Sequence, residues 1–249
     1  MDILSDEEML RYNRQIILKN FDFDGQEALK QSSILIIGAG GLGCAASQYL
    51  AAAGVGTLTL VDDDVVELSN LQRQVLHHDA GIGLKKVDSA KQALEKLNPH
   101  LSVHTFDKRL SDDELEAQII KHTLVLDATD NVETRNQLNR LCYQHKIPLV
   151  CGAAIRMEGQ ISVFTYQDST QPCYCCLSTL FGETSLSCVE AGVMSPIVGI
   201  IGATQALEAI KIIANYGTPK VAKLMLFDGL TLNWREMGLP KSKQCPVCS

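Results

Sequence analysis

The sequence predicts an α/β fold in which helices cover both faces of a mixed β-sheet. Two observations predict this class. Between residues 31 and 150, short apolar β-branched runs alternate with helical windows, which is typical of a parallel sheet with crossover helices. After Gly159 the pattern changes to strand-like segments and one long apolar helix, which predicts an antiparallel extension of the same sheet.

The expected elements follow in chain order. Residues 5–30 form a helical arm, because Ser5 and Glu8 have the spacing of a capping box ahead of a periodic apolar pattern. Strands are expected at residues 34–37, 57–61, 103–106, 123–126, 148–151, 161–166 and 223–227. Helices are expected at residues 43–53, 84–97, 112–121, 132–145 and 198–214. Residues 180–193 are rich in Ser, Thr and Gly without clear periodicity, so we expect them to be mobile.

The composition is that of an ordinary globular protein. With 249 residues, of which 46% are hydrophobic and 20% charged, the chain can bury a large core in one domain, residues 1–249. We divide it into the arm (1–30), a nucleotide-binding half (31–150) and a second half (151–249). A net charge of -7 argues against a nucleic-acid partner. The acidic start is unlike a secretory signal, and polar residues interrupt the apolar stretch 193–213, so we expect a cytoplasmic protein without a membrane span.

A glycine-rich turn joins the first predicted strand to the next helix. Gly38, Gly40 and Gly43 satisfy the G-x-G-x-x-G pattern in a strand-turn-helix setting, which makes this half Rossmann-like. Small residues let the backbone approach a phosphate, whose charge is favoured at a helix N-terminus. Asp62 closes the second strand, where a carboxylate can bond to a ribose hydroxyl. The alternatives are a structural tight turn and, for Asp62, an ordinary surface turn; the pattern alone does not choose among NAD, FAD and ATP.

A triphosphate is favoured by Lys86 and the polar run Ser69-Asn70-Leu71-Gln72-Arg73-Gln74. A triphosphate that loses pyrophosphate needs cations to balance the charge on the leaving group, whereas a dehydrogenase needs few. The alternatives are a surface ion pair for Arg73 and a solvated helix face for Lys86. Asp130 follows a predicted strand at the edge of the sheet where ligands bind, so it is a candidate magnesium ligand. Its alternative is the N-cap of the helix that begins near Val132.

The nine cysteines favour metal binding or thiol chemistry over a disulfide framework, since no export signal is present. Four of them form two Cys-x-x-Cys pairs that can supply thiolates to a tetrahedral zinc: Cys173 with Cys176, and Cys245 with Cys248. Four unliganded thiols are the alternative, and Cys175 leaves open which sulfur of the first pair coordinates. Three others are expected to be buried apolar side chains: Cys44, Cys142 and Cys151. The six histidines show no ligand or triad spacing.

Taken together, these motifs give the sequence a family resemblance. It resembles the ubiquitin-activating-enzyme-like adenylyltransferases of the molybdopterin and thiamin pathways, nearly end to end. The resemblance runs through residues 11–15, 40–43, 68–74 and 127–131 and through the paired cysteines. Residues 152–160 and 188–193 look more similar to the molybdopterin branch than to the thiamin branch.

The resemblance implies a reaction, a site and partners. The reaction is ATP-dependent adenylation of the C-terminal glycine carboxylate of a ubiquitin-fold sulfur-carrier protein, the small subunit of molybdopterin synthase; the thiamin-pathway carrier is the alternative. The implied ATP site comprises Gly41, Asp62, Ser69, Asn70, Leu71, Gln72, Arg73, Lys86, Asp130 and Asn131. The implied catalytic residues are Arg73, Lys86, Asp130, which holds Mg²⁺, and Arg14, which reaches the ATP of the neighbouring subunit in a homodimer. Residues 151–249 would bind the carrier and hold a structural zinc at the two cysteine pairs.

The proposed chemistry needs no general base, because a terminal carboxyl with a pKa of about 3.3 to 3.7 is already ionised at neutral pH. Cys188 matches a position that forms covalent sulfur links in relatives, but adenylation does not require it. No sulfur-transfer domain follows Cys248, so we expect a separate protein to donate sulfur. The rival hypotheses are an NAD-dependent oxidoreductase that uses the same glycine turn, and a non-enzymatic scaffold that only docks the carrier.

Overall fold

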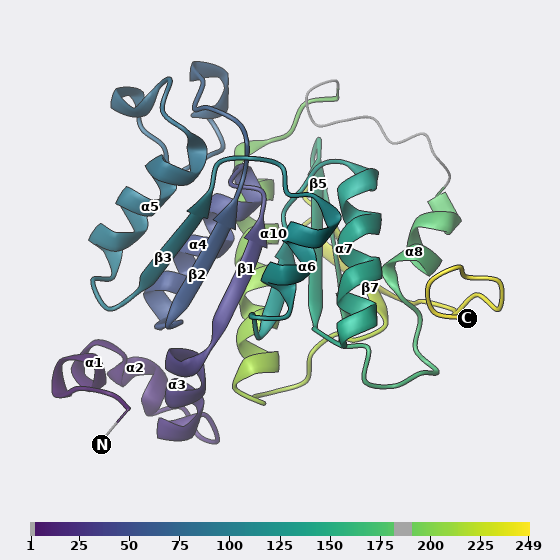
Figure 1. The fold of residues 1–249 in the computed structure, drawn as a ribbon, viewed down its shortest axis with the longest axis horizontal. Coiled ribbons are helices and arrows are strands. Elements are labelled where there is room, and N and C mark those ends of the chain that lie inside the picture. Colours follow the sequence, from purple (N-terminus) through teal and green to yellow (C-terminus); the bar gives the residue numbers. More distant parts are fainter. Residues whose placement is uncertain (1–2, 182–190) are drawn as a thin grey trace.

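The computed structural model describes residues 3–181 and 191–249, and within them eight strands form one mixed sheet (Figure 1). The strand order is β3-β2-β1-β4-β5-β6-β7-β8. Five strands pair in parallel: β1 (Ser33–Ile37), β2 (Thr57–Val61), β3 (Ser102–Phe106), β4 (Leu124–Asp127) and β5 (Leu149–Ile155). The sheet continues with antiparallel pairing through β6 (Glu158–Phe164), β7 (Lys223–Asp228) and β8 (Asn233–Gly238). The predicted parallel half with an antiparallel extension is confirmed.

Helices cover both faces of this sheet, as predicted. One face carries α4 (Gly41–Ala53), α5 (Lys86–Leu97) and α10 (Ser195–Ile213). The other face carries α6 (Asp112–Ile119), α7 (Val132–His145) and α8 (Tyr174–Phe181). Strand β1 supplies both cores, because successive side chains of a strand point to opposite faces. Ile34 and Ile36 lie in the α4 core, whereas Leu35 and Ile37 lie in the α7 core.

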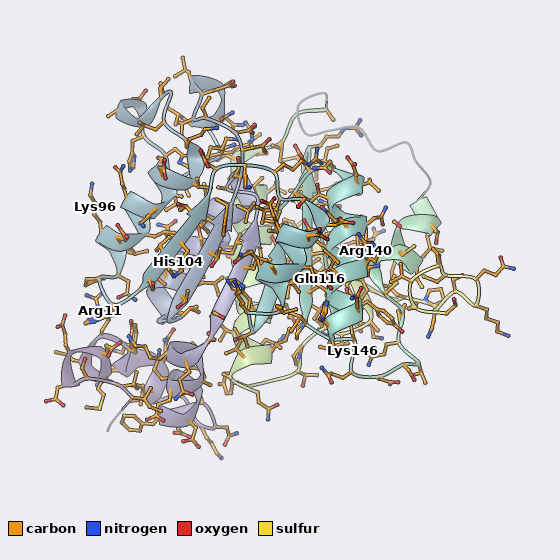
Figure 2. The ribbon with its side chains drawn as sticks, viewed as in Figure 1. Arg11, Lys96, His104, Glu116, Arg140 and Lys146 are labelled. Carbon is orange, nitrogen blue, oxygen red and sulfur yellow. The ribbon has the colours of Figure 1, made fainter. Side chains whose placement is uncertain are left out.

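The outer surface of α6 and α7 is polar, and Figure 2 labels Glu116 and Arg140 on it. Arg140 pairs with Asp112 at 2.5 Å, and Glu116 accepts a hydrogen bond from Gln144 at 2.9 Å. Exposed pairs of this kind add little stability, because water screens their attraction. The stability of the two helices therefore comes mainly from their buried faces.

The N-terminal arm consists of three short helices, α1 (Asp6–Arg11), α2 (Asn13–Ile16) and α3 (Asp22–Gln31). The predicted capping box is present, with Ser5 and Glu8 bonded to each other's backbone N–H. Tyr12 accepts a 2.7 Å hydrogen bond from Asn98 at the end of α5, and Gln15 donates to the Ala53 carbonyl at the end of α4. The arm therefore lies at the amino ends of the parallel strands, with α3 leading directly into β1 (Figure 1).

Helix α10 is long and apolar enough to cross a membrane by length and composition alone. In this structure it packs between α4 and strands β5 and β6, and Ile201, Gln205 and Ala209 are fully buried. This is the buried helix that the sequence predicted. The crossing with α4 is close because Gly202 lies directly against the Leu42 carbonyl and the Ala45 methyl group.

Within the described residues, one α-helix, one strand and two short 3-10 helices (Leu68–Asn70 and Asp79–Gly81) were not predicted from the sequence. Helix α8 occupies the cysteine-rich stretch, and β8 forms the far edge of the sheet. Every residue of β8 is exposed, so its sequence lacks the alternation of buried and exposed positions that identifies a strand. Most of the segment expected to be mobile, residues 182–190, lies outside the described residues.

The α4–α10 crossing gives a stability prediction. Gly202→Ala would place a Cβ 2.5 Å from the Leu42 carbonyl oxygen, so overpacking should lower the free energy of unfolding by about 1–3 kcal/mol. Gly199→Ala, on the same helix, meets nothing within 4 Å and should be neutral or stabilising by up to about 1 kcal/mol, because alanine favours helix. Denaturant unfolding of both variants measures the difference; equal stabilities would contradict the close crossing.

Candidate active site

A cleft of about 1140 Å³ lies at the carboxyl ends of β1, β2 and β4. Its walls are the glycine turn, the aspartates after β2, the 67–74 segment, the start of α5 and the turn between β4 and α7. Seven of the predicted ATP-site residues line it: Gly41, Asp62, Asn70, Arg73, Lys86, Asp130 and Asn131. Three other members of the predicted set, Ser69, Leu71 and Gln72, are not among its lining residues. The fold thus gathers residues that are up to 90 positions apart in the sequence.

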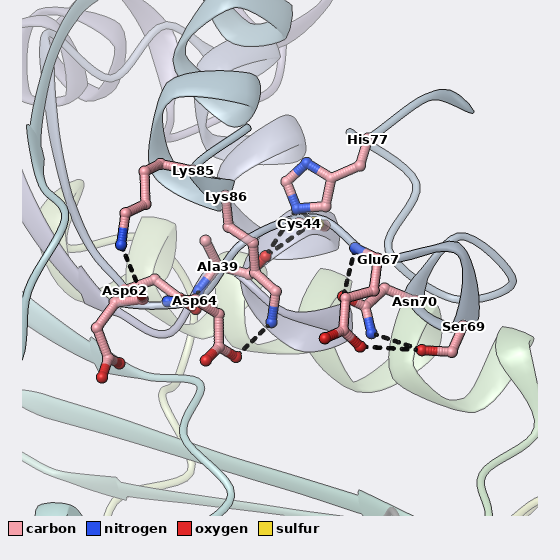
Figure 3. Close-up of polar contacts among 11 residues, drawn as sticks. Ala39, Cys44, Asp62, Asp64, Glu67, Ser69, Asn70, His77, Lys85 and Lys86 are labelled. Carbon is pink, nitrogen blue, oxygen red and sulfur yellow. Dashed lines mark hydrogen bonds and ion pairs between the residues drawn. The ribbon is translucent and has the colours of Figure 1, made fainter. Parts of the chain in front are cut away.

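The glycine turn forms one wall of the cleft (Figure 3). Gly38 has φ +97°, and a Cβ on Gly43 would lie 1.9 Å from the Gly38 carbonyl oxygen, so only glycine fits these positions. The N-cap of α4, Gly40, has no side chain to bond the first amides of the helix. These N–H groups therefore remain available to an anion in the cleft.

Asp62 and Lys86 are both held in place beside the turn (Figure 3). Asp62 accepts hydrogen bonds from the backbone N–H of Ala39 at 2.7 Å and of Asp64 at 2.9 Å. Lys86 is only 6% exposed, and its Nζ pairs with Asp64 at 2.7 Å. The alternative of a solvated helix face for Lys86 is therefore wrong.

The segment after β2 brings Arg73 and Gln74 to the cleft. The Arg73 guanidinium donates to the Ser69 carbonyl at 3.1 Å and forms no ion pair with any residue that the structure describes. The alternative of a surface ion pair is thus wrong for the described part of the chain. Gln74 is buried against Gly40, and its Oε1 has no hydrogen-bond partner there. The sequence analysis included Gln74 in the polar run but gave it no role, because only its burial in the folded chain distinguishes it.

The turn between β4 and α7 presents Asp130 to solvent. The N-cap of α7 is Asn131, whose Oδ1 accepts the Thr134 N–H at 2.9 Å. The alternative that Asp130 caps this helix is therefore wrong. Asp130 is exposed in the cleft, and its side chain forms no hydrogen bond or ion pair with the described part of the chain, so its carboxylate is free to bind a cation.

A buried ion pair between Asp127 and Arg135 stabilises this turn. Arg135 Nε lies 3.6 Å from Asp127 Oδ2, and Arg135 Nη2 donates to the carbonyls of Thr129 and Gly152 at 2.6 and 3.0 Å. Burial acts to lower the pKa of Arg135, but the Asp127 carboxylate outweighs it and the pKa is raised. Sequence reasoning missed both residues, because nothing in a single sequence distinguishes a buried charge from an exposed one.

Two further cations, Lys108 and Arg109, reach the cleft from the loop after β3. Lys108 pairs with Glu114, and Arg109 donates to Asn131 Oδ1 at 3.3 Å and to Thr134 Oγ1 at 3.0 Å. No motif marked them in the sequence. Arg109 also pairs with Glu133 at 3.4 Å, so both of these cations have acidic partners.

Arg14 lies far from this cleft. It belongs to α2, at the amino ends of the strands, whereas the cleft is at their carboxyl ends (Figure 1). The five residues of β1 alone span about 15 Å between the two ends. Arg14 is exposed, and within the described chain it has no hydrogen bond or ion pair to another residue. It therefore does not reach the cleft of its own chain.

The two cysteine pairs come together on the α7 side of the sheet. Cys173, Cys176, Cys245 and Cys248 are buried, with their sulfur atoms within 4.8 Å of one another. A tetrahedral zinc with Zn–S bonds of about 2.3 Å requires S···S separations of about 3.8 Å. The closest pairs, Cys173–Cys245 at 3.6 Å and Cys176–Cys248 at 3.5 Å, fit this requirement. The group can hold a metal ion, and Cys175 is not part of it.

Four further cysteines and one buried histidine complete the set of candidate groups. Cys44, Cys142 and Cys151 are buried, as predicted, and Cys188 lies outside the described residues. One histidine was missed: His77 is buried directly beneath the glycine turn (Figure 3).

Comparison with known proteins adds to this geometry. Residues 12–247 match the model of the ThiF family. The chain is 63% identical over 245 residues to the Molybdopterin-synthase adenylyltransferase of Escherichia coli (strain K12), covering 98% of each chain. It is 43% identical to the Sulfur carrier protein ThiS adenylyltransferase of the same organism, covering 98% of this chain and 97% of that one. The crystal structure of E. coli MccB with MccA-N7isoASN aligns with a TM-score of 0.85 over 96% of this chain and 75% of that one, at 22% identity.

Proposed function

The chain belongs to the ThiF family, and we propose that it uses ATP to adenylate the C-terminal glycine carboxylate of a ubiquitin-fold sulfur-carrier protein. The carrier is the small subunit of molybdopterin synthase, and the pathway is molybdenum cofactor biosynthesis. The observation that carries this proposal is a cleft in which glycine-turn amides, Arg73, Lys86 and Asp130 converge in a chain 63% identical to the named adenylyltransferase. The thiamin-pathway carrier remains the alternative substrate, at 43% identity.

The reaction joins a carboxylate oxygen of the carrier to the α-phosphorus of ATP. The bond from that phosphorus to the bridging oxygen breaks, and pyrophosphate leaves with the electron pair. Arg73 and Lys86 balance the charge that builds on the pyrophosphate, while the amides at the start of α4 hold phosphate oxygens. Asp62 holds the ribose, and Asp130 holds Mg²⁺, which supplies further charge neutralisation when bound. No proton has to be removed, so positioning and charge stabilisation suffice.

The carrier's docking surface, in this proposal, is the exposed edge of the sheet. Strand β8 ends the sheet, and large apolar side chains stand exposed on it and on the preceding turn: Leu230, Leu232, Trp234 and Met237. An exposed apolar edge strand invites association, so a partner surface is expected there. Leu226 of β7 and Gln160 of β6 line the cleft, which gives the carrier's C-terminal tail a continuous path to ATP. Residues 151–249 thus form the carrier-binding half.

A homodimer completes the site in this proposal. Arg14 cannot reach its own cleft, but exposed apolar residues flank it on the arm: Leu10, Ile17, Leu18 and Phe23. A second exposed apolar group borders the cleft on the 65–84 segment: Leu68, Val75, Ile82 and Leu84. Packing of one group on the other across a two-fold axis would bury both and bring Arg14 to the partner's ATP phosphates. The adenylate then passes to a separate sulfur donor, and we place all of these steps in the cytoplasm.

The central test is pyrophosphate exchange. Labelled pyrophosphate should enter ATP only when the carrier is present, and faster with the molybdopterin-synthase small subunit than with the thiamin carrier. Asp130→Ala should lower exchange by about 100-fold or more, whereas Glu133→Ala, an exposed acid of the same cleft, should stay within about threefold of wild type. Binding of NAD without any exchange would overturn the proposal, and full activity of Asp130→Ala would remove its role at magnesium.

Mixed dimers test the shared site. Arg14→Ala and Asp130→Ala should each be inactive as pure proteins. When they are unfolded and refolded together, half of the dimers should be mixed, and each should hold one intact site, which restores about a quarter of wild-type exchange. Mixing Arg73→Ala with Asp130→Ala should restore nothing, because both residues serve the cleft of their own chain. Recovery in the second mixture, or none in the first, would contradict the arrangement.

Zinc is the proposed occupant of the four-cysteine group. Cys176→Ser should lose bound zinc and unfold at a lower temperature, because a structural metal contributes directly to folding free energy. Cys175→Ser is the matched control and should retain about one zinc per chain, since its sulfur lies outside the group. Metal analysis and thermal unfolding measure both effects. Equal zinc contents in the two variants would contradict this ligand set.

A further inference from the structure

His77 makes a buried contact with the glycine turn that the proposed reaction has not used. Its Nε2 lies 3.2 Å from the Ala39 carbonyl oxygen, and its Nδ1 lies 3.0 Å from Ser89 Oγ on α5. The ring is 4% exposed, and Cys44 Sγ is 3.6 Å from the same Nε2. The imidazole thus contacts α4 through Cys44 and α5 through Ser89, and Figure 3 shows His77 and Asp62 on opposite sides of Ala39.

The contact with Ala39 fixes the direction of one backbone amide. A trans peptide is planar, and its C=O and N–H point in opposite directions. The Ala39 carbonyl points to His77, so the N–H of Gly40 in the same peptide points away from His77, toward the cleft that Gly40 lines. Gly40 N–H donates to no residue in the described part of the chain. The preceding amide is also fixed, because Ala39 N–H donates to Asp62 at 2.7 Å.

The protonation state of the ring follows from its partners. A carbonyl oxygen can only accept, so Nε2 carries a hydrogen, and Nδ1 then accepts the Ser89 hydroxyl. Burial, the largest influence, lowers the pKa of His77, and the positive charge of Lys86 acts in the same direction. A neutral ring with its hydrogen on Nε2 therefore gives both ring nitrogens a hydrogen-bond partner.

His77 joins three segments of the cleft wall. Its ring bonds to the glycine turn through Ala39 and to α5 through Ser89, which follows Lys86 by one turn of helix. Its backbone N–H donates to the Gln74 carbonyl at 3.0 Å, one residue beyond Arg73. The ring therefore couples the Gly40 amide to the helix that carries Lys86, and the backbone of His77 links both to the Arg73 segment.

We propose that His77 is a positioning residue for ATP, whose neutral imidazole holds the Ala39–Gly40 peptide with its N–H toward the nucleotide phosphates and ties the glycine turn to α5. This inference deepens the proposed function and rests on ATP as the nucleotide. His77 touches neither substrate nor reacting atoms. It acts by pre-orienting donors, so its loss should weaken ATP binding without affecting the carrier surface.

The test compares three substitutions by calorimetric titration with ATP and Mg²⁺. His77→Phe removes both ring nitrogens and should weaken ATP binding by about 10- to 100-fold. His77→Gln places an amide N–H near the position of Nε2 and should stay within about threefold of wild type, whereas His77→Asn reaches only the Nδ1 position and should resemble phenylalanine. The Kd for the carrier should not change in any of them. If His77→Phe does not fold, the comparison of Gln with Asn decides alone.

A matched control is His122→Phe. His122 is also buried and bonded through both ring nitrogens, to the Gln118 carbonyl at 2.6 Å and Thr59 Oγ1 at 2.8 Å, but it lies outside the cleft. Loss of a buried imidazole there should lower stability and leave the Kd for ATP unchanged. The inference is overturned if folded His77→Phe binds ATP like wild type, or if Gln and Asn variants are equally impaired. This test measures ATP binding directly. Absence of pyrophosphate exchange in the wild type would therefore contradict the proposed function without contradicting the role of His77.

Discussion

The buried ion pair of Asp127 and Arg135 is the interaction on which the cleft depends. An unpaired charge at this depth would cost several kcal/mol, so the two residues must stay together. Arg135 also bonds to the carbonyls of Thr129 and Gly152, and Gln205 of α10 donates to the Asp127 carbonyl at 2.8 Å. One network thus links the end of β4, the middle of β5, the start of α7 and the middle of α10. The turn that presents Asp130 is held by this ion pair and by the Arg135 hydrogen bond to the Thr129 carbonyl.

Hydrogen bonds to the glycine turn hold the opposite wall of the cleft in place. The Ala39 peptide groups are held by Asp62 on one side and by His77 on the other, which leaves the next amides facing the cleft. Donors fixed before a ligand arrives need no reorganisation during a reaction, and this favours charge stabilisation over proton transfer. The reaction we propose has that requirement, because its nucleophile is already ionised. The four-cysteine group lies apart from this chemistry, where Asn139 of α7 donates to Cys173 Sγ at 3.5 Å and anchors it to the core.

The surfaces outside the cleft differ in polarity. Apolar side chains are exposed on the arm, beside the cleft and along β8, whereas the outer face of α6 and α7 carries ion pairs. In the proposed function, a dimer would bury the apolar groups on the arm and beside the cleft, and the carrier would bury the group on β8. Each contact would remove apolar area from water. In the proposed function, the site therefore draws on three chains: its own glycine turn and cations, an arginine from a second copy and a carboxylate from the carrier.

The sequence by itself determined the strand-turn-helix around Gly38 to Gly43, the alternating parallel half and the two cysteine pairs. These are local signals, because hydrophobic period, glycine spacing and Cys-x-x-Cys spacing are each written within a few residues. The sequence could not place Arg135, His77 or Gln74, since each owes its role to burial and to partners 8 to 38 positions away. It also left the N-cap of α7 open, and only backbone geometry assigned it to Asn131. The tertiary structure alone decided that Arg14 and the cleft lie at opposite ends of β1, because the direction of parallel strands separates them.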